Sequence, residues 1–339
     1  MTIFVFTTAF LISFIMTPMM IRLGLKLGIS DKPNGRRQHQ TITSRFGGIA
    51  IFSGFVGTCI LIFILNPPPA NSLESQLLKG VIVGAVFVFC YGLLDDFFDL
   101  SPKPQFVAQF ITACIAIYFS IFIEIVTLPF IGETTFQWFI SYPLTIFWVM
   151  GMLNTVNFLD GLDGLAAGVA TIAVLLFAWH AYSLGQMQVY LFPLALAGAC
   201  LGFLPFNFYP AKIFMGSTGS LTLGWALASL SILAPAKVAT ALLVLGIPII
   251  DVAWLMMWRW YKLGSPMVPG RDHLHFRLVD RGFNQRTIVY GYYLFCSIFG
   301  ILALLMSSRV YKLMALIFLG LLTFVLVWIL AKKDSGVRG

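Results

Sequence analysis

The sequence predicts an all-α polytopic integral membrane protein that crosses the bilayer about eleven times. Three observations lead to this fold class: 59% of the 339 residues are hydrophobic, only 10% are charged, and the apolar runs are continuous. Soluble domains average about 25% charged residues, and membrane β-barrels alternate apolar and polar positions along each strand. The composition therefore excludes an ordinary soluble enzyme, a disordered chain and an outer-membrane barrel.

Apolar segments near the length that spans a bilayer, about 20 residues, follow one another along the chain. Pro-rich or polar breaks such as "NPPPANSLESQ" separate them. The first segment carries no charge before Arg22 and lacks the basic start of a signal peptide, so we expect it to be a retained span. The predicted spans cover residues 2–21, 46–66, 79–94, 105–124, 138–155, 163–182, 188–204, 218–234, 238–258, 287–307 and 311–330.

The net charge of +8 is unequally distributed between the two sides of this predicted bundle. Seventeen of the 21 Lys and Arg residues fall on one side, which the positive-inside rule places in the cytoplasm. The N-terminus is then outside and the C-terminus inside, as an odd number of spans requires. We therefore take the charge as an orientation signal and expect no nucleic-acid partner. We predict one transmembrane catalytic domain, residues 1–339, with cytoplasmic loops at about 22–45, 95–104, 156–162, 205–217 and 259–286.

A cluster of carboxylates lies at the predicted cytoplasmic end of the third span, in "LLDDFFDL". It contains Asp95, Asp96 and Asp99. Adjacent carboxylates repel one another, and such pairs commonly hold Mg²⁺ or use one member as a base with a raised pKa. A solvated helix end explains one aspartate well, but it explains three within five residues poorly.

A second polar cluster, "NTVNFLDGLDGL", follows the fifth span and offers Asn157, Asp160 and Asp163. Amide and carboxylate oxygens are the hard ligands that suit Mg²⁺, which usually binds a few carboxylates together with substrate phosphates. The two Asp-Gly steps favour turns that bring the backbone close to a phosphate or a metal. An ordinary polar turn between helices would need only one such step.

Three further segments on the same side contain residues suited to binding anions. "KIFMGSTGSLTLG" opens the eighth span with glycines, and free N–H groups at a helix start favour phosphate, although glycine and serine also serve packing. "PGRDHLHFRLVDRGFNQR" carries arginines and two histidines without a nearby cysteine, which favours an anion over zinc. The third segment, near the N-terminus, contains "SDKPNGRRQHQ". Together with the carboxylates, these segments suit phosphoryl transfer from a nucleotide diphosphate to a lipid.

One carboxylate, Asp251, lies inside the ninth predicted span. Ionisable groups are costly within a membrane and are usually functional there. We expect Asp251 either to pair with an arginine of the following loop or to contact the substrate.

Five motifs in this order resemble those of the polyprenyl-phosphate N-acetylhexosamine-1-phosphate transferases, the WecA/MraY group, and are most similar to the WecA-like branch. They are "DKPNGRRQHQ", "LDDFFDLS", "NFLDGLDGL", "KIFMGSTGS" and "SPMVPGRDHLHF". The resemblance implies transfer of GlcNAc-1-phosphate from UDP-GlcNAc to undecaprenyl phosphate, releasing UMP. It also implies Mg²⁺, with Mn²⁺ as a substitute, a multi-pass bacterial inner-membrane protein surrounded by membrane lipid, an active site on the cytoplasmic face, and a homodimer. The implied pathway is cell-envelope polysaccharide synthesis, such as that of lipopolysaccharide O-antigen.

The resemblance also implies a role for each matching residue. Asp95 and Asp96 match the catalytic pair, and with Asp160 and Asp163 they form the predicted catalytic and metal-binding set. The predicted substrate-binding residues are Asp31, Asn34, Asn157, Lys212, Gly216, Ser220, Arg271, His273, His275 and Arg277. One-step attack and a covalent phospho-aspartate are both proposed for the family. We favour direct attack, because a lipid phosphate is already anionic at pH 7.

Two positions depart from the family pattern. Ser217 stands where the family has the aspartate that is its principal Mg²⁺ ligand, and Phe276 ends the His-x-His-His pattern. Three explanations for Ser217 stay open: an engineered inactivating substitution, a natural variant that uses Asp160 or Asp163 instead, and a non-catalytic homologue that binds nucleotide sugar or lipid. A different UDP-N-acetylhexosamine substrate is also compatible with the motifs. A secondary transporter fits poorly, because no inverted repeat is visible.

Overall fold

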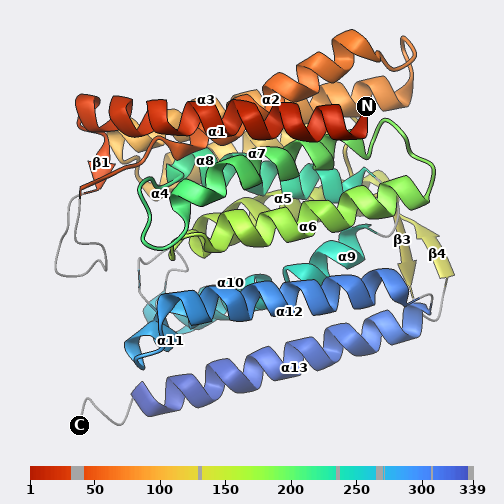
Figure 1. Ribbon diagram of the computed structural model, residues 1–339. Coiled ribbons are helices and arrows are strands. Elements are labelled where there is room, and N and C mark those ends of the chain that lie inside the picture. Colours follow the sequence, from red (N-terminus) through yellow and green to blue (C-terminus); the bar gives the residue numbers. More distant parts are fainter. Residues whose placement is uncertain are drawn as a thin grey trace.

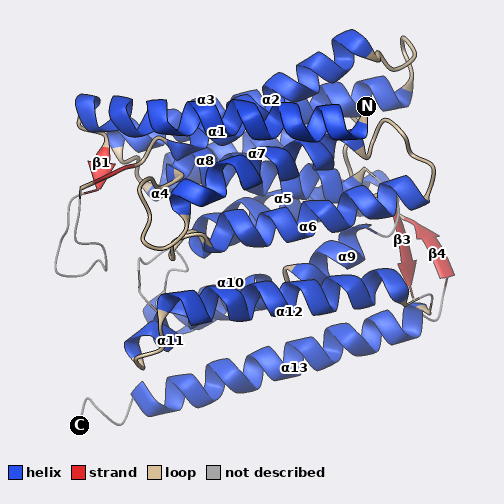
Figure 2. Ribbon diagram, viewed as in Figure 1, coloured by secondary structure: helices blue, strands red, loops and turns tan. Residues whose placement is uncertain are grey.

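The computed structural model is a helical bundle with two short hairpins (Figures 1 and 2). It describes residues 1–31, 42–128, 132–233, 237–264, 270, 272–306 and 308–334. This architecture confirms the prediction of an all-α membrane protein at the level of fold class. The described chain begins and ends, at Met1 and Asp334, at opposite ends of the bundle in Figure 1.

The first eight helices form the larger part of the bundle, and α8 lies at its centre. Every residue from Thr218 to Ser231 of α8 is buried. The helix packs against α2, α3 and α5, while α1 packs against α2 and α7. These helices are α1 (Thr2–Leu27), α2 (Gly47–Leu65), α3 (Leu73–Phe98), α4 (Pro102–Tyr118), α5 (Trp138–Leu159), α6 (Leu165–Ser183), α7 (Leu191–Asn207) and α8 (Gly216–Ile232).

The remaining helices form a second layer, seen in blue and cyan in the lower half of Figure 1. They are α9 (Lys237–Val244), α10 (Gly246–Leu263), α11 (Leu274–Asp280), α12 (Gln285–Leu305) and α13 (Arg309–Asp334). The ninth predicted span is broken, since α9 and α10 meet at an angle of 81°. Helix α12 packs against α6 and α9, and α13 packs against α10. The short helix α11 lies in a segment that we predicted to be a loop.

Two antiparallel hairpins, which the sequence did not predict, lie at opposite ends of the bundle (Figure 2). One pairs β1 (Ser30–Asp31) with β2 (Thr43–Ser44), and the other pairs β3 (Ile125–Leu128) with β4 (Gly132–Thr135). Strands of two to four residues are too short to leave a periodic pattern. The first hairpin matters for the site, because Ser44 also forms a parallel bridge with Ile213 just before α8.

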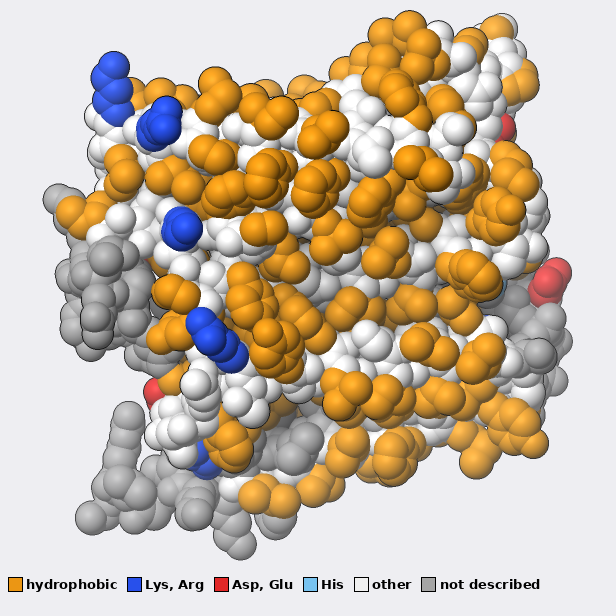
Figure 3. Space-filling model, viewed as in Figure 1, with side chains coloured by type: hydrophobic (Ala, Val, Ile, Leu, Met, Phe, Trp, Pro, Cys, Tyr) orange, Lys and Arg blue, Asp and Glu red, His pale blue; other side chains and the backbone are white. Residues whose placement is uncertain are grey.

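The apolar helices are consistent with several membrane crossings. Six described helices are long and apolar enough to span a bilayer, or seven if the bent pair α9–α10 counts as one span. Each of the eleven predicted ranges is mainly helical, although the ninth is divided between α9 and α10, so the multi-pass helical prediction is confirmed, while the number eleven stays a prediction. Figure 3 shows a broad apolar belt with Lys and Arg gathered toward the end that carries β1 and α11. The orientation of that end toward the cytoplasm also stays a prediction.

The helices at this basic end extend further than predicted. Helix α1 continues to Leu27, α3 to Phe98, α5 to Leu159, α7 to Asn207 and α10 to Leu263, so parts of all five predicted loops are helical. Hydropathy falls where charged residues begin, but a helix continues wherever neighbouring protein accommodates the polar side chains. The last turns of α3 show this, since Asp96 is only 4% exposed.

Candidate active site

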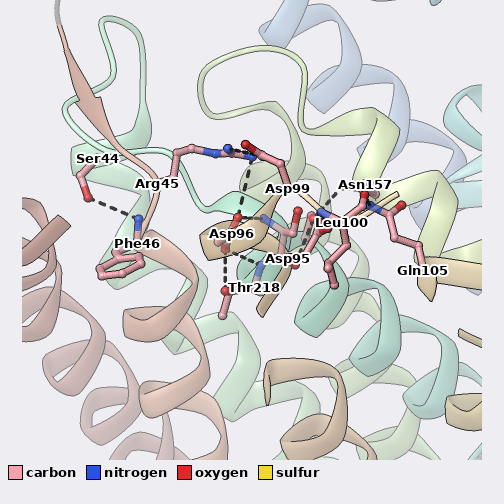
Figure 4. A network of polar contacts seen from close by, with 12 residues as sticks. Ser44, Arg45, Phe46, Asp95, Asp96, Asp99, Leu100, Gln105, Asn157 and Thr218 are labelled. Carbon is pink, nitrogen blue, oxygen red and sulfur yellow. Dashed lines mark hydrogen bonds and ion pairs between the residues drawn. The ribbon is translucent and has the colours of Figure 1, made fainter. Parts of the chain in front are cut away.

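Asp96, in the last turn of α3, holds the beginning of α8. One oxygen of its carboxylate accepts a hydrogen bond from the backbone N–H of Ser217 at 2.8 Å. The other oxygen accepts from the backbone N–H of Thr218 at 2.9 Å and from the Thr218 hydroxyl at 2.6 Å (Figure 4). The first N–H groups of a helix lack partners within the helix, so a buried carboxylate from another helix satisfies them and complements the helix dipole.

This arrangement corrects the expectation of free N–H groups at the start of α8. Asp96 accepts from the N–H groups of the second and third residues of α8, Ser217 and Thr218, and the N–H of Gly219 bonds to the carbonyl of Met215. Gly216 makes the approach possible, because a Cβ atom there would lie 2.6 Å from Asp96 Oδ2 and 2.4 Å from the Arg45 carbonyl oxygen. Its positive φ of 66° also suits glycine. The structure thus gives Gly216 a packing role, and its substrate contact stays a prediction.

Arg45 approaches the same carboxylates from the segment between β2 and α2. Its guanidinium lies 3.2 Å from Asp99 and 3.9 Å from Asp96 (Figure 4). The bridge between Ser44 and Ile213 and the bond from the Phe46 N–H to the Ser44 hydroxyl hold this segment beside α8. In the sequence, Arg45 was explained by orientation alone. The adjacent "FGG", where α2 begins, is the one local signal that its position is structurally defined.

Asp95 takes different partners from its neighbour. One of its oxygens accepts from the backbone N–H of Leu100 at 3.1 Å and from the side-chain amide of Gln105, in α4, at 3.0 Å. It therefore joins the end of α3 to the beginning of α4, as Figure 4 shows. Successive side chains on a helix point about 100° apart, so Asp95 faces α4 while Asp96 faces α8.

The turn after α5 brings two further carboxylates toward Asp96. Asp160 ends α5, and Asp163 accepts a hydrogen bond from the backbone N–H of Ala211 at 2.9 Å. Buried Asn207, which the sequence did not single out, joins the two loops: its oxygen accepts from the Gly164 N–H, and its amide donates to the carbonyl of Ile213.

The electrostatics of this turn set Asp160 apart. Burial, the neighbouring carboxylates of Asp163 and Asp96, and only partial compensation by Arg45 raise its pKa well above the usual range. Within the described part of the chain its carboxylate accepts no hydrogen bond, unlike those of Asp95, Asp96 and Asp163. Asp160 therefore has oxygens open to a cation.

Asn157 and Ser220 lie together beside these carboxylates. The Ser220 hydroxyl donates to the Asn157 side-chain oxygen at 3.0 Å, which joins the last turns of α5 to the first turn of α8. The structure thus brings these two predicted substrate-binding residues into one contact.

The histidine segment packs against the turn after α5. The His273 ring stacks on Phe158 with centroids 5.0 Å apart, and on His275 at 5.7 Å. A Cβ atom added to Gly161 would lie 2.4 Å from His275 Nε2, so the histidine and the glycine backbone are in close contact. Arg277 donates to the backbone carbonyl of Asp272 at 2.6 Å. The structure therefore gathers the carboxylate and histidine motifs at one end of the bundle.

The described partner of Asp251 is a histidine and not the expected arginine. Asp251 does contact the following segment, but the described contact is with a histidine, His273, at 3.0 Å. Arg259 pairs with Asp272 instead.

The other predicted residues lie at the edges of this site or outside the description. Asp31 is half-buried in β1, opposite Thr43, and Lys212 is exposed next to Ala211. Asn34 and Arg271 fall outside the described residues. The roles of all the predicted site residues stay predictions.

Comparison with known proteins shows the family. A family profile described as glycosyl transferase family 4 matches residues 78–235. A Bacillus subtilis protein named probable undecaprenyl-phosphate N-acetylglucosaminyl 1-phosphate transferase is 34% identical over 310 residues, which cover 89% of this chain and 84% of the relative. The chain belongs to the polyprenyl-phosphate N-acetylhexosamine-1-phosphate transferases, the WecA/MraY group.

Two more members of this transferase family show its breadth. A decaprenyl-phosphate N-acetylglucosaminephosphotransferase of Mycobacterium tuberculosis is 31% identical over 318 residues, covering 86% of this chain and 79% of the relative. A phospho-N-acetylmuramoyl-pentapeptide-transferase of Staphylococcus saprophyticus is 32% identical over 306 residues, covering 83% and 91%. The relatives share a phosphosugar-transfer activity by name, and they differ in the sugar or the lipid that their names give.

Ser217, the departure from the family pattern, lies in the first turn of α8, beside Asp96 in the candidate site. It is the second residue of α8, and its N–H contacts Asp96. A carboxylate there would join Asp96 and the turn that holds Asp160 and Asp163. The structure accommodates the serine in an ordinary helix start, so nothing in the fold required the loss of the aspartate.

The donor set fits a magnesium ion of the kind that substrate phosphates complete. No group of three or more His, Cys, Asp or Glu side chains in the described ranges is arranged to hold a metal by itself. Mg²⁺ usually binds one or two carboxylates and takes the rest of its ligands from water and phosphate. The open carboxylate of Asp160, with Asp163 beside it, meets that requirement.

Proposed function

We propose that the protein transfers N-acetylglucosamine-1-phosphate from UDP-GlcNAc to undecaprenyl phosphate, giving undecaprenyl-diphospho-GlcNAc and UMP. The observation that carries the proposal is the convergence of Asp96, Asp160 and Arg45 at the buried start of α8, beside the histidine segment. Two of the relatives described above act on N-acetylglucosamine phosphate by name.

In the proposed reaction, an oxygen of the lipid phosphate attacks the β-phosphorus of UDP-GlcNAc. The bond from that phosphorus to the bridging oxygen breaks, and UMP leaves with the electron pair. Such transfers need positioning and neutralised charge more than covalent help from the protein. Both oxygens of Asp96 already accept hydrogen bonds from α8, which supports direct attack over a phosphorylated Asp96.

Different residues of this chain would bind the metal, contact the phosphates and position the start of α8. Asp160 and Asp163 would hold Mg²⁺, which supplies positive charge to the pyrophosphate when it is bound. Arg45 and the histidine segment would add donors to phosphate oxygens. Asp96 would keep the start of α8, and with it Ser217 and Ser220, at a fixed distance from the turn after α5.

The test is a transfer assay on purified protein in lipid nanodiscs. Undecaprenyl phosphate and Mg²⁺ are supplied with labelled UDP-GlcNAc, UDP-GalNAc or UDP-MurNAc-pentapeptide, and the lipid product and UMP are both measured. We expect product from UDP-GlcNAc, and a strong increase in Ser217→Asp with a lower Mg²⁺ requirement. Ser183→Asp, which adds a carboxylate at an exposed position at the other end of α6, is the matched control and should not increase the rate.

Ser217 also supports a second candidate, a non-catalytic member of the family that binds the nucleotide sugar. Binding of UDP-GlcNAc without turnover in both the unaltered chain and Ser217→Asp would favour this candidate and contradict the proposed transfer. Product from another UDP-sugar alone would retain the reaction and change the donor.

A further inference from the structure

Two buried charged residues of α10 hold the segment that precedes α11. Asp251 and Arg259, both 3% exposed, are eight residues apart and therefore lie near the same face of the helix. Arg259 pairs with Asp272, and Asp251 contacts the next residue, His273. Burying a charge is costly unless it is paired, so two such pairs on successive residues define the position of this segment closely.

Each oxygen of Asp251 has its own partner. Oδ1 accepts from the backbone N–H of Leu274 at 3.0 Å, and Oδ2 lies 3.0 Å from Nδ1 of His273. An ionised carboxylate only accepts hydrogen bonds, so Nδ1 of His273 must carry a proton. When the ring is neutral, Nε2 then carries a lone pair.

Nε2 of His273 is one of the buried side-chain atoms for which the described part of the chain offers no hydrogen-bond partner. Buried polar atoms without partners are rare in proteins and require an explanation, such as a role in binding or catalysis. The ring itself is held by stacking between Phe158 and His275, at 5.0 and 5.7 Å. Phe158 follows Asn157 directly, which places Nε2 near the proposed nucleotide site.

We propose that Asp251 is a positioning residue for the transferase. It sets His273 in the Nδ1–H tautomer, which leaves Nε2 to accept a hydrogen bond from a donor group of the bound substrate. A carboxylate that bonds to one ring nitrogen fixes the tautomer and orientation of a histidine in this way. The inference rests on the proposed function for its substrate, but the tautomer itself is independent of any activity.

Asp251→Asn tests the inference directly, because the neighbouring groups determine the orientation of the new side-chain amide. The Leu274 N–H needs an acceptor, so it holds the amide oxygen, and the amide NH₂ then faces Nδ1 of His273. Facing a donor, Nδ1 must become the acceptor, and the ring proton moves to Nε2. A substitution of nearly the same shape thereby exchanges the two ring nitrogens.

The primary measurement is ¹⁵N NMR of the full-length protein in nanodiscs, with only histidine labelled. The chain has four histidines, so the His273 signals are assigned by their loss in His273→Gln. At a pH where the ring is neutral, we expect a protonated Nδ1 and an unprotonated Nε2 in the unaltered chain, and the reverse in Asp251→Asn. Asp280→Asn, an exposed change on α11, is the matched control and should leave the signals unchanged.

The second measurement is a kinetic double-mutant cycle on the transfer reaction. Loss of a partner that orients a histidine typically costs about 10–100-fold in activity, and we expect that loss in kcat/KM for Asp251→Asn. Because Asp251 acts through His273, the double variant with His273→Gln should be no slower than His273→Gln alone. Asp280→Asn should retain the rate of the unaltered chain.

The outcomes separate this inference from the proposed function. An unchanged His273 tautomer in a folded Asp251→Asn, or additive losses in the cycle, would overturn the positioning role even if transfer is confirmed. Absence of transfer in every variant, with the tautomer exchanged as expected, would contradict the proposed function and support the arrangement of Asp251 and His273. If Asp251→Asn does not fold, the Nε2–H tautomer in the unaltered chain would by itself overturn the inference.

Discussion

Asp95 and Asp96 show how little adjacency in the sequence says about a shared role. Asp96 caps α8 through three hydrogen bonds, whereas Asp95 joins α3 to α4 through Leu100 and Gln105. A hydrogen bond to a charged group contributes about 1.5–3 kcal/mol to stability, so both aspartates do structural work whatever their part in catalysis. Loss of activity in a variant of either residue would therefore need a measure of folding beside it.

Asp160 offers a cleaner experiment, because its buried carboxylate lies near two other carboxylates and accepts no hydrogen bond from the described residues. The pKa of Asp160 is raised in the folded protein, whereas in the unfolded chain it has the ordinary value of about 4. As the pH rises, the unfolded chain therefore loses this proton before the folded protein does. The metal-free protein therefore loses stability as pH rises from that value through the raised pKa of the folded state. Asp160→Asn removes the buried charge, so we expect its Tm at neutral pH without divalent cations to exceed that of the unaltered chain.

The same argument predicts the response to metal. Mg²⁺ should raise the Tm of the unaltered chain and release protons, measured by calorimetry in buffers of different ionisation enthalpy, while Asp160→Asn responds weakly. Asp280→Asn serves again as the control for the loss of one carboxylate. A lower Tm in metal-free Asp160→Asn would show that the carboxylate stabilises the fold, contrary to our account.

The beginnings of α2 and α8 interlock, and this contact fixes the site more than any loop does. The N–H groups of Gly47 and Gly48 donate to the carbonyls of Phe214 and Met215, just before α8. A Cβ atom on Gly48 would lie 2.1 Å from the Gly219 nitrogen, a backbone atom that has no room to move. Small residues allow this close approach of helices in membrane proteins.

Two glycines of α2, Gly48 inside that contact and Gly57 outside it, provide a test and its control. Gly48→Ala should lower stability by about 1–3 kcal/mol through overpacking and should also lower transfer, because it displaces α8 from Asp96. Gly57→Ala, where a Cβ atom meets nothing within 4 Å, should be neutral or stabilising by up to about 1 kcal/mol. Unfolding in detergent measures both, and equal stabilities of the two variants would contradict the interlock.

The distribution of charge over the bundle gives the proposed orientation. The polar motifs gather toward the end that holds β1 and α11, while Glu133 belongs to the β3–β4 hairpin at the opposite end (Figures 1 and 3). A bundle with an odd number of crossings begins and ends on opposite sides, as Figure 1 shows for the described chain. By the positive-inside rule we expect the site to face the cytoplasm, where nucleotide sugars are available.

Cysteine labelling in intact cells tests this orientation. Glu133→Cys and Asp280→Cys each add a thiol at an exposed position at opposite ends of the bundle. A membrane-impermeant maleimide should label Glu133→Cys in intact cells and Asp280→Cys only after permeabilisation. The unaltered chain, whose exposed Cys90 and Cys114 lie within apolar helices, measures the background. The reverse pattern would invert the topology.

Sequence reasoning succeeded where the signal was continuous or chemical. Long apolar runs located a helix in every predicted span. The structure also brings the clustered aspartates, histidines and Asp-Gly steps to one end of the bundle, while their roles stay predictions. Sequence reasoning missed Arg45 and Asn207, single polar residues whose importance comes from contacts more than 40 residues away along the chain. It also ended several helices too early, because hydropathy records the membrane boundary and not the last hydrogen-bonded turn.

The residues alone established a multi-pass helical protein and placed its chemistry at one end, since burial in lipid requires apolar helices and leaves charged residues conspicuous. Folding decided which of those residues meet. It directed Asp96 onto α8, left Asp160 open, and paired Asp251 with His273. The physical reason is that a hydrogen bond depends on distances of about 3 Å between segments far apart in the chain, which composition and spacing do not contain.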